Sequence, residues 1–258
     1  MKDKTVQELK TAVCEANLDL VKAGLVSQTF GNVSGIDRER GLVAIKPSGV
    51  DYTRLKPSHI SVVSLMTGEL VEGHLRPSSD TPTHLVLYRA FNAIGGIAHT
   101  HSTCATAWAQ AAREIPVFGT THADFFPGSV PCTRFLNTEE IASDYETATG
   151  NVIVERFSEL DPLLVPGVLV VGHGPFTWGM NAHEAVQHAV ALELIARLAL
   201  ETLSINPAAV PIPQALIDKH FSRKHGPGAY YGQKLTGRST SVQPDTADQK
   251  PKTRRCQR

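Results

Sequence analysis

The segment GGIAHTHSTCATAWAQ, residues 95–110, sets the expectation for both the fold and the site. Small and apolar residues run up to His99, which predicts a strand, and the alanine-rich stretch after it predicts a helix. His99 and His101 flank a single threonine, and side chains two positions apart on a strand point to the same face. The pair is therefore placed as two metal ligands would be. An isolated His-x-His also occurs as ordinary surface or core histidines, so a third ligand is needed.

A third histidine lies in VVGHGPF, residues 170–176. His173 stands between two glycines at the end of an apolar strand, where backbone or ligand can approach closely. Three neutral imidazoles would leave a fourth position open, as in catalytic zinc sites. The alternative is a buried histidine satisfied by a backbone hydrogen bond. Spacing alone leaves both interpretations open.

Three loops upstream of the histidine pair are rich in small and hydroxyl-bearing residues: FGNVSG at 30–35, KPSG at 46–49 and PSSD at 77–80. Backbone N–H groups in such turns, and at the helix start after Ser79, favour a bound anion. Turns of this composition are common surface connectors. Three of them before the histidine pair nevertheless favour phosphate recognition.

Hydrophobic periodicity and turn residues divide the chain into expected elements. Within 41–52 we expect a short strand that runs into the KPSG turn. We also expect strands at 95–101, 167–171 and 174–179, and a hairpin formed by 60–65 and 69–73. We expect helices at 9–20, 83–95, 103–112, 182–203 and 213–225, and one from Asn137 toward Gly150. Thr81 is the expected N-cap of the second helix, with Pro82 at its first position. Residues 27–35 and 119–134 are expected to be loops.

Composition describes an ordinary α/β chain of 258 residues, 41% hydrophobic and with no formal net charge. Nothing in it favours nucleic acid or a membrane surface. The N-terminus lacks the apolar core of a signal peptide, and the four cysteines have no paired spacing. We therefore expect a cytoplasmic protein with reduced thiols. Residues 1–234 are expected to form one domain, followed by a polar, disordered tail at 235–258, whose basic end is a solvated terminus rather than an RNA-binding arm.

Several motifs together resemble the metal-dependent class II aldolase family, and within it the L-ribulose-5-phosphate 4-epimerases. They are GNVSG, IKPSGVDY, PSSDTPTH, HTHSTCATAWAQ, GTTHADFF, PGVLVVGHGPFTWG, DKHFSRKHG and AYYGQ. The resemblance runs in order from Leu9 to Gln233, and the tail after it departs from the family pattern. It implies a three-layer α/β/α fold with a central, mostly antiparallel sheet. It also implies a homotetramer with active sites at subunit interfaces.

The same resemblance implies a role for each candidate residue. The metal ligands are His99, His101 and His173, with Asp80 as a carboxylate at the metal, which is Zn²⁺ or another divalent cation such as Mn²⁺ or Co²⁺. The residues that bind the substrate phosphate and nearby oxygens are Gly31, Asn32, Ser48, Gly49, Ser78 and Ser79, and Lys46 adds positive charge. Asp124 and Tyr231 match the catalytic acid/base pair, and His220 matches a histidine that reaches a neighbouring subunit's site.

The implied reaction inverts the fourth carbon of L-ribulose 5-phosphate to give D-xylulose 5-phosphate, by retro-aldol cleavage, aldehyde rotation and re-addition. The alternative within the family is an aldolase acting on another sugar phosphate, such as L-fuculose 1-phosphate. Such relatives carry glutamate where Asp80 stands. A non-catalytic protein would be expected to lack some of these residues. The sequence leaves open whether arabinose, ascorbate or another pentose route supplies the substrate.

Overall fold

The computed structural model describes residues 5–225 and residue 229. Its strands are β1 Asn32–Asp37, β2 Leu42–Ile45, β3 Ser61–Ser64, β4 Leu70–Glu72, β5 Gly96–His99, β6 Gly167–Val170 and β7 Gly174–Gly179. Its α-helices are α1 Val6–Lys22, α2 Thr81–Ala90, α3 Thr103–Gln110, α4 Thr120–Ala123, α5 Thr138–Ala142, α6 Tyr145–Arg156, α7 Ala182–Ile205 and α8 Gln214–His225.

The strands form one sheet in the order β4-β3-β2-β1-β5-β7-β6, and each of its six pairings is antiparallel. Neighbouring strands in the chain are joined by short turns at β1–β2, β3–β4 and β6–β7. Strand β5 then enters the middle of the sheet, between β1 and β7. The expected antiparallel sheet is confirmed, and the strand that carries His99 lies inside it, beside the central strand β1.

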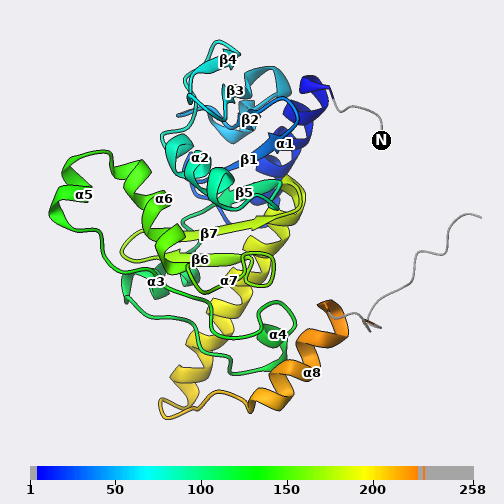
Figure 1. The fold of residues 1–258 in the computed structure, drawn as a ribbon. Coiled ribbons are helices and arrows are strands. Elements are labelled where there is room, and N and C mark those ends of the chain that lie inside the picture. The colour runs from blue at the N-terminus through cyan, green and yellow to red at the C-terminus, as the bar shows by residue number, and fades with distance from the viewer. Residues whose placement is uncertain (1–4, 226–228, 230–258) are drawn as a thin grey trace, which may run out of the picture.

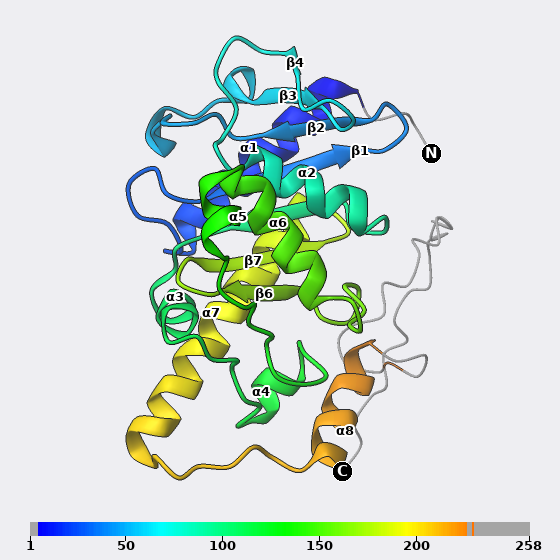
Figure 2. The same cartoon turned by 60° about the vertical axis from the view of Figure 1, so that its left-hand side comes forward.

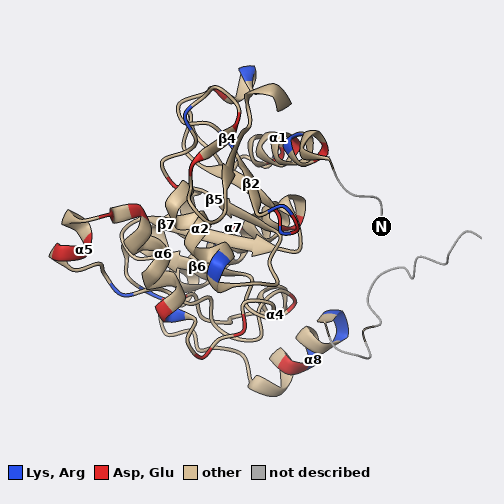
Figure 3. Cartoon of the chain, turned by 45° about the horizontal axis from the view of Figure 1, so that its top comes forward, with Lys and Arg blue, Asp and Glu red and all other residues tan. Residues whose placement is uncertain are grey.

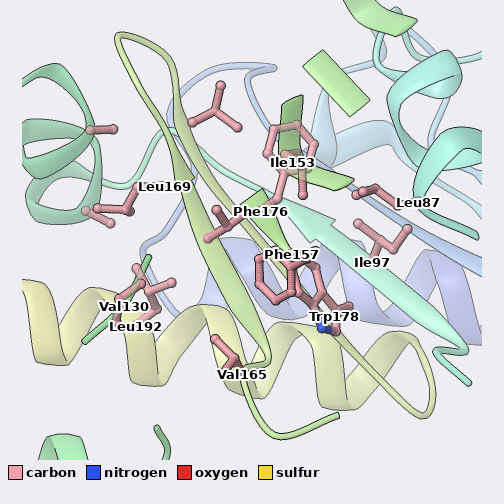
Figure 4. Close-up of a cluster of buried hydrophobic side chains, with 14 of the residues drawn as sticks. Leu87, Ile97, Val130, Ile153, Phe157, Val165, Leu169, Phe176, Trp178 and Leu192 are labelled. Carbon is pink, nitrogen blue, oxygen red and sulfur yellow. The ribbon is translucent and has the colours of Figure 1, made fainter. Parts of the chain in front are cut away.

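Helices cover both faces of this sheet, which gives the three expected layers (Figures 1 and 2). Successive residues of a strand point to opposite faces. Ala98 packs in a cluster with α1 and the first part of α7, whereas Ile97 packs in the larger cluster with α2, α3 and α6. Figure 4 shows the larger cluster, in which Phe176 and Trp178 of β7 lie beside Phe157 at the end of α6.

The first expected loop, residues 27–35, is only partly a loop, because β1 begins at Asn32. Its polar composition suggested a turn, but Asn32 and Ser34, the polar residues of its strand part, are buried and make hydrogen bonds. The Ser34 hydroxyl lies 2.7 Å from His84 Nδ1 and 2.8 Å from the Tyr88 hydroxyl. Buried polar groups that find partners are tolerated in a central strand, so composition alone gave the wrong prediction.

The other differences are local. Residues 119–134 contain the short helix α4, and the predicted helix from Asn137 is two helices, α5 and α6, which are interrupted at Ser143. Helix α2 has Asp80 as its N-cap position, one residue before the predicted Thr81. The Asp80 side chain makes no cap hydrogen bond and bonds Asn32 instead.

Among the helices of the described residues, none has both the length and the hydropathy needed to cross a bilayer. Cys14, Cys104 and Cys132 are free thiols in this part of the chain, as predicted.

Candidate metal centre

Three histidines from two parts of the chain meet at one end of the central strands. His99 is the last residue of β5, His101 follows it, and His173 lies in the turn between β6 and β7. The pairing of His99 with Phe176 brings that turn to the end of β5. One ligand nitrogen from each histidine lies within 4.8 Å of the other two, so the group could hold a metal ion.

The ring of His99 is fixed in orientation by its surroundings. Its Nδ1 lies 3.0 Å from the carbonyl oxygen of Pro175, and its face stacks on Phe176 with ring centroids 4.1 Å apart. Its Nε2 therefore faces the other histidines and lies 3.1 Å from His101 Nε2. Two ring nitrogens aimed at the same point, with the outer nitrogen on a carbonyl, are the usual arrangement of metal-binding histidines.

Burial lowers the pKa of all three imidazoles. His99 shows the largest shift, because it is 1% exposed and because His173 and His101 add like charge. For His101, the effect of burial is partly opposed by the Asp80 carboxylate; for His173, His101 adds to burial while Asp80 opposes. The rings are thus neutral at neutral pH and present lone pairs. This donor set fits zinc, and also other borderline divalent ions.

Asp80 lies close enough to influence two of these histidines, but its hydrogen bond goes elsewhere. Asn32 Nδ2 donates to Asp80 Oδ2 at 2.6 Å and lies 3.2 Å from the Ser78 hydroxyl. The oxygen of the same amide, Asn32 Oδ1, is buried and has no hydrogen-bond partner in the described structure. It is an acceptor available to a bound hydroxyl group. Asp80 as a metal ligand stays a prediction.

The histidines open onto a cavity of about 390 Å³ that also contains the predicted phosphate turns. Its lining includes Gly31, Asn32, Lys46, Ser48, Gly49, Ser78, Ser79, Asp80, His99, His101 and His173. The KPSG and PSSD turns are joined side by side, since Ser48 N donates to Arg76 O at 2.9 Å and Ser78 N to Lys46 O at 3.1 Å. Residues predicted from five separate motifs therefore share one cavity.

Gly31 is required by this geometry. Its φ is +92°, and a Cβ there would lie 2.9 Å from the Val26 side chain and 3.0 Å from the His99 carbonyl oxygen. Only glycine adopts this conformation without strain and fits against the strand that carries the metal ligand.

Lys46 is the buried cation of the cavity, at 2% exposed. Its ammonium lies 4.6 Å from the centre of the Tyr52 ring and 3.4 Å from the Pro47 carbonyl oxygen. Burial lowers its pKa, and Asp51 partly opposes the shift. A lysine with so few partners in a cavity is suited to a bound anion.

Asp124 and His220 contact each other and do not line this cavity. Asp124 ends α4, and α8 packs against that helix (Figure 2). His220 Nδ1 lies 3.1 Å from Asp124 Oδ1, and Arg223 donates to both carboxylate oxygens at 2.8–3.1 Å. Burial raises the pKa of Asp124, but hydrogen bonds from Arg223, His220 and Lys224 outweigh it and hold that pKa below its usual range. Tyr231 lies outside the described residues.

Sequence reasoning missed Tyr145 and Arg223. The Tyr145 hydroxyl lies 3.4 Å from His173 Nδ1, although the two residues belong to different motifs and no spacing connects them. Arg223 was visible only as one of several basic residues in DKHFSRKHG. Its pairing with Asp124 depends on the packing of α8 on α4.

The chain is similar in sequence to named enzymes over most of its length. Two proteins named L-ribulose-5-phosphate 4-epimerase UlaF, from Salmonella paratyphi B (strain ATCC BAA-1250 / SPB7) and Salmonella typhi, are 57% identical to it over 229 residues. Each match covers 89% of this chain and 100% of the relative.

Solved structures share the fold. An L-fuculose 1-phosphate aldolase superposes with a TM-score of 0.71 and 26% identity, covering 84% of this chain and 95% of its own. An L-fuculose-1-phosphate aldolase from Thermus thermophilus gives a TM-score of 0.62 at 24% identity, covering 78% and 97%. Residues 11–200 match the family model described as the class II aldolase and adducin N-terminal domain. The chain belongs to this family.

Proposed function

We propose that this protein is a metal-dependent epimerase that interconverts L-ribulose 5-phosphate and D-xylulose 5-phosphate. The observation that carries this function is that the three neutral histidines and the phosphate-type turns line one cavity. The relatives that are 57% identical over their full length and bear this enzyme name support the choice of substrate.

The chemistry explains why both halves of the cavity are needed. The hydrogen on the fourth carbon is not adjacent to the ketone, so its removal would leave an unstabilised carbanion. Cleavage between the third and fourth carbons avoids this and gives an enediolate and glycolaldehyde phosphate. A bound divalent ion supplies Lewis acidity toward the negative charge of the three-carbon fragment. The aldehyde then rotates and is attacked on its other face.

The residues of the cavity hold the two fragments in place during that rotation. The turns that carry Ser48, Gly49, Ser78 and Ser79 bind the phosphate, with the Lys46 ammonium beside them. The unpaired Asn32 Oδ1 accepts a substrate hydroxyl. Retaining the aldehyde preserves proximity between the reacting carbons, which is a large contribution that binding groups make to such a reaction.

Proton transfer to the aldehyde oxygen in its two orientations is assigned to Asp124 and Tyr231. In one chain Asp124 lies outside the cavity, paired with His220 and Arg223. We therefore assign these residues to the cavity of a neighbouring copy, in a cytoplasmic homotetramer with sites at its interfaces. The proposed catalytic domain is residues 1–234; the tail at 235–258 lies outside the described residues.

An aldolase that releases its products is the second candidate, and the likeness to L-fuculose 1-phosphate aldolase favours it. Asp80 distinguishes the two, because its short carboxylate is held by Asn32 at 2.6 Å. A longer glutamate could reach the donor carbon as a base.

The test is incubation of the purified, zinc-loaded protein with L-ribulose 5-phosphate, followed by product analysis. We expect D-xylulose 5-phosphate to accumulate to equilibrium without free fragments. Accumulation of dihydroxyacetone and glycolaldehyde phosphate would assign the protein to the aldolases. Metal content of the protein as purified, and activity after reloading with Zn²⁺, Mn²⁺ or Co²⁺, identifies the native divalent ion.

A further inference from the structure

His173 Nδ1, the ring nitrogen that faces away from the other two histidines, contacts a tyrosine from another part of the fold. The Tyr145 hydroxyl lies 3.4 Å from His173 Nδ1, and the two ring centroids are 6.2 Å apart at an angle of 37°. Because Nδ1 faces the tyrosine, Nε2 is the nitrogen left to face His99 and His101. The ring centroid of His173 is 4.7 Å and 5.0 Å from theirs.

The Tyr145 side chain is 38% exposed, but the helix start that carries it is fixed by hydrogen bonds and helix packing. Tyr145 is the first residue of α6, whose N-cap Asp144 accepts hydrogen bonds from Thr147 N and from the Thr147 hydroxyl. Helix α6 lies against α2, and the Thr83 hydroxyl of α2 donates to the Glu146 carbonyl oxygen at 2.6 Å. The tyrosine therefore reaches the metal ligands from a fixed helix start.

A close contact between the two helices fixes their separation. A Cβ added at Gly150 would lie 2.7 Å from Cβ of Val86, so glycine permits an approach that alanine would not. Helix α2 begins directly after Asp80. The same packing thus positions the PSSD turn and the tyrosine together.

We propose that Tyr145 is a positioning residue for the metal centre: its hydroxyl oxygen accepts a hydrogen bond from Nδ1–H of His173. This inference rests on the proposed metal-dependent function. A neutral imidazole that binds a metal through Nε2 must carry its proton on Nδ1, and a partner for that proton fixes the tautomer and the ring orientation. His99 receives the same support from the Pro175 carbonyl oxygen. Tyr145 gives His173 the same support through a side-chain hydroxyl, which a substitution can remove.

The experiment compares Tyr145→Phe with Thr147→Val in the full-length protein. Y145F removes only the hydroxyl, whereas T147V removes a hydroxyl from the same helix start and weakens its cap. Zinc affinity is measured by competition with a chromophoric chelator. We expect the Kd for zinc to rise by about tenfold or more in Y145F, the size of loss typical of such outer partners, and by much less in T147V.

The visible absorption of the Co²⁺-loaded proteins gives a second readout that does not depend on catalysis. Its bands should shift in Y145F and should superpose on wild type in T147V. Equal zinc affinity and equal spectra in wild type and Y145F would overturn the proposal. So would an equal loss in T147V, or a Y145F protein that loses its fold, since the hydroxyl would then serve the helix and not the metal. Wild-type protein that binds no ion would instead reject the metal-dependent function itself.

Discussion

His99 depends on burial for its role. The ring is enclosed by Phe176 and bonded to the Pro175 carbonyl oxygen, so a proton on Nε2 would create a charge that water cannot reach. The ring therefore stays neutral at neutral pH and keeps its lone pair toward the other two histidines. Loss of this ring would remove a ligand and leave a void against Phe176.

His99→Asn tests the ligand assignment. Since loss of an outer partner alone costs about 10–100-fold in metal affinity, loss of a direct ligand should cost about a hundredfold or more, and activity should fall with it. Metal content after dialysis and chelator competition measure the effect. His183→Asn is the matched control, because His183 is an exposed histidine of α7. A dialysed H99N protein with stoichiometric zinc would contradict the assignment.

Two histidines outside the ligand set make the metal-free fold sensitive to acid. Burial lowers the pKa of His122 to about 4, although its bonds to Gly128 and Pro116 oppose the shift, and lowers that of His84 to about 3. Both pKa values lie below the value of about 6.5 in the unfolded chain. At a pH between the folded and the unfolded pKa, each histidine therefore binds more protons in the unfolded chain than in the folded one. Stability is therefore fully present above about pH 6.5 and is lost as the pH falls.

We expect the free energy of unfolding of the metal-free protein to fall by about 2 kcal/mol for each of these histidines between pH 7 and pH 5. Urea unfolding at the two values measures it, and His122→Asn should remove its share of the difference. Ionised carboxylates such as Asp124 add their losses only at lower pH, because the pKa of Asp124 is lowered. Equal stability at pH 7 and pH 5 would contradict the prediction.

At the scale of elements, the contact between α2 and α6 connects the sheet to the metal centre. Helix α2 carries His84 and Tyr88 beneath β1, and α6 carries Tyr145. The contact depends on Gly150, where no side chain fits. A change at this one position should therefore affect both stability and the metal ligands.

Gly150→Ala should lower the free energy of unfolding by about 1–3 kcal/mol, because the new methyl group forces two packed helices apart. It should also weaken zinc binding through the displacement of Tyr145. Gly128→Ala is the control, since a Cβ there meets nothing within 4 Å. Urea unfolding and chelator competition measure the two effects. If G150A is destabilised but binds zinc as tightly as wild type, the contact between α2 and α6 does not affect the metal centre.

Elements with strong periodicity were predictable, and those specified by tertiary contacts were not. The β6–β7 hairpin and α7 follow from apolar runs and from the Asn181 cap, which accepts from Glu184 N. Strand β1 was missed because its buried polar residues find tertiary partners: Ser34 bonds His84 and Tyr88 of α2, and Asn32 bonds the PSSD turn. The His-x-His pair and the turns indicated the cavity, whereas Tyr145 reaches it only through helix packing. Family resemblance supplied the roles of Asp124 and His220, which spacing could not.

At the scale of the whole molecule, Asp124, which is assigned to proton transfer, lies apart from the three-histidine group of the same chain. Helix α8 packs on α4 below the sheet, and its last turn carries a group of basic residues (Figures 2 and 3). Asp124 meets these residues and not the histidine cavity. The proposed proton transfer by Asp124 therefore requires the cavity of a second copy.

Asp124→Asn and Tyr231→Phe should each lower kcat by on the order of a hundredfold or more, since positioned acid/base groups contribute at least that much. Both variants should keep their metal, because neither residue belongs to the histidine group. Steady-state kinetics and metal analysis measure the two outcomes. Full activity in both variants would remove these assignments.

Mixing two inactive variants tests the shared site directly. Tetramers reassembled from equal amounts of H99N and D124N should regain about a quarter of wild-type activity, because one interface in four then pairs an intact histidine group with an intact Asp124. Each variant alone, taken through the same treatment, is the control. A mixture as inactive as its components would place the whole site within one chain.

The position of His173 in the β6–β7 hairpin has a consequence for biosynthesis. The nascent chain produces His99 and His101 well before β6 and β7, so an emerging chain holds two of the three ligands without the third. Ion capture in this cavity must therefore follow translation of the β6–β7 hairpin and its insertion beside β5. Metal binding would then indicate that β6 and β7 have joined the sheet. A ribosome-stalled chain that ends before residue 173 would not retain the ion.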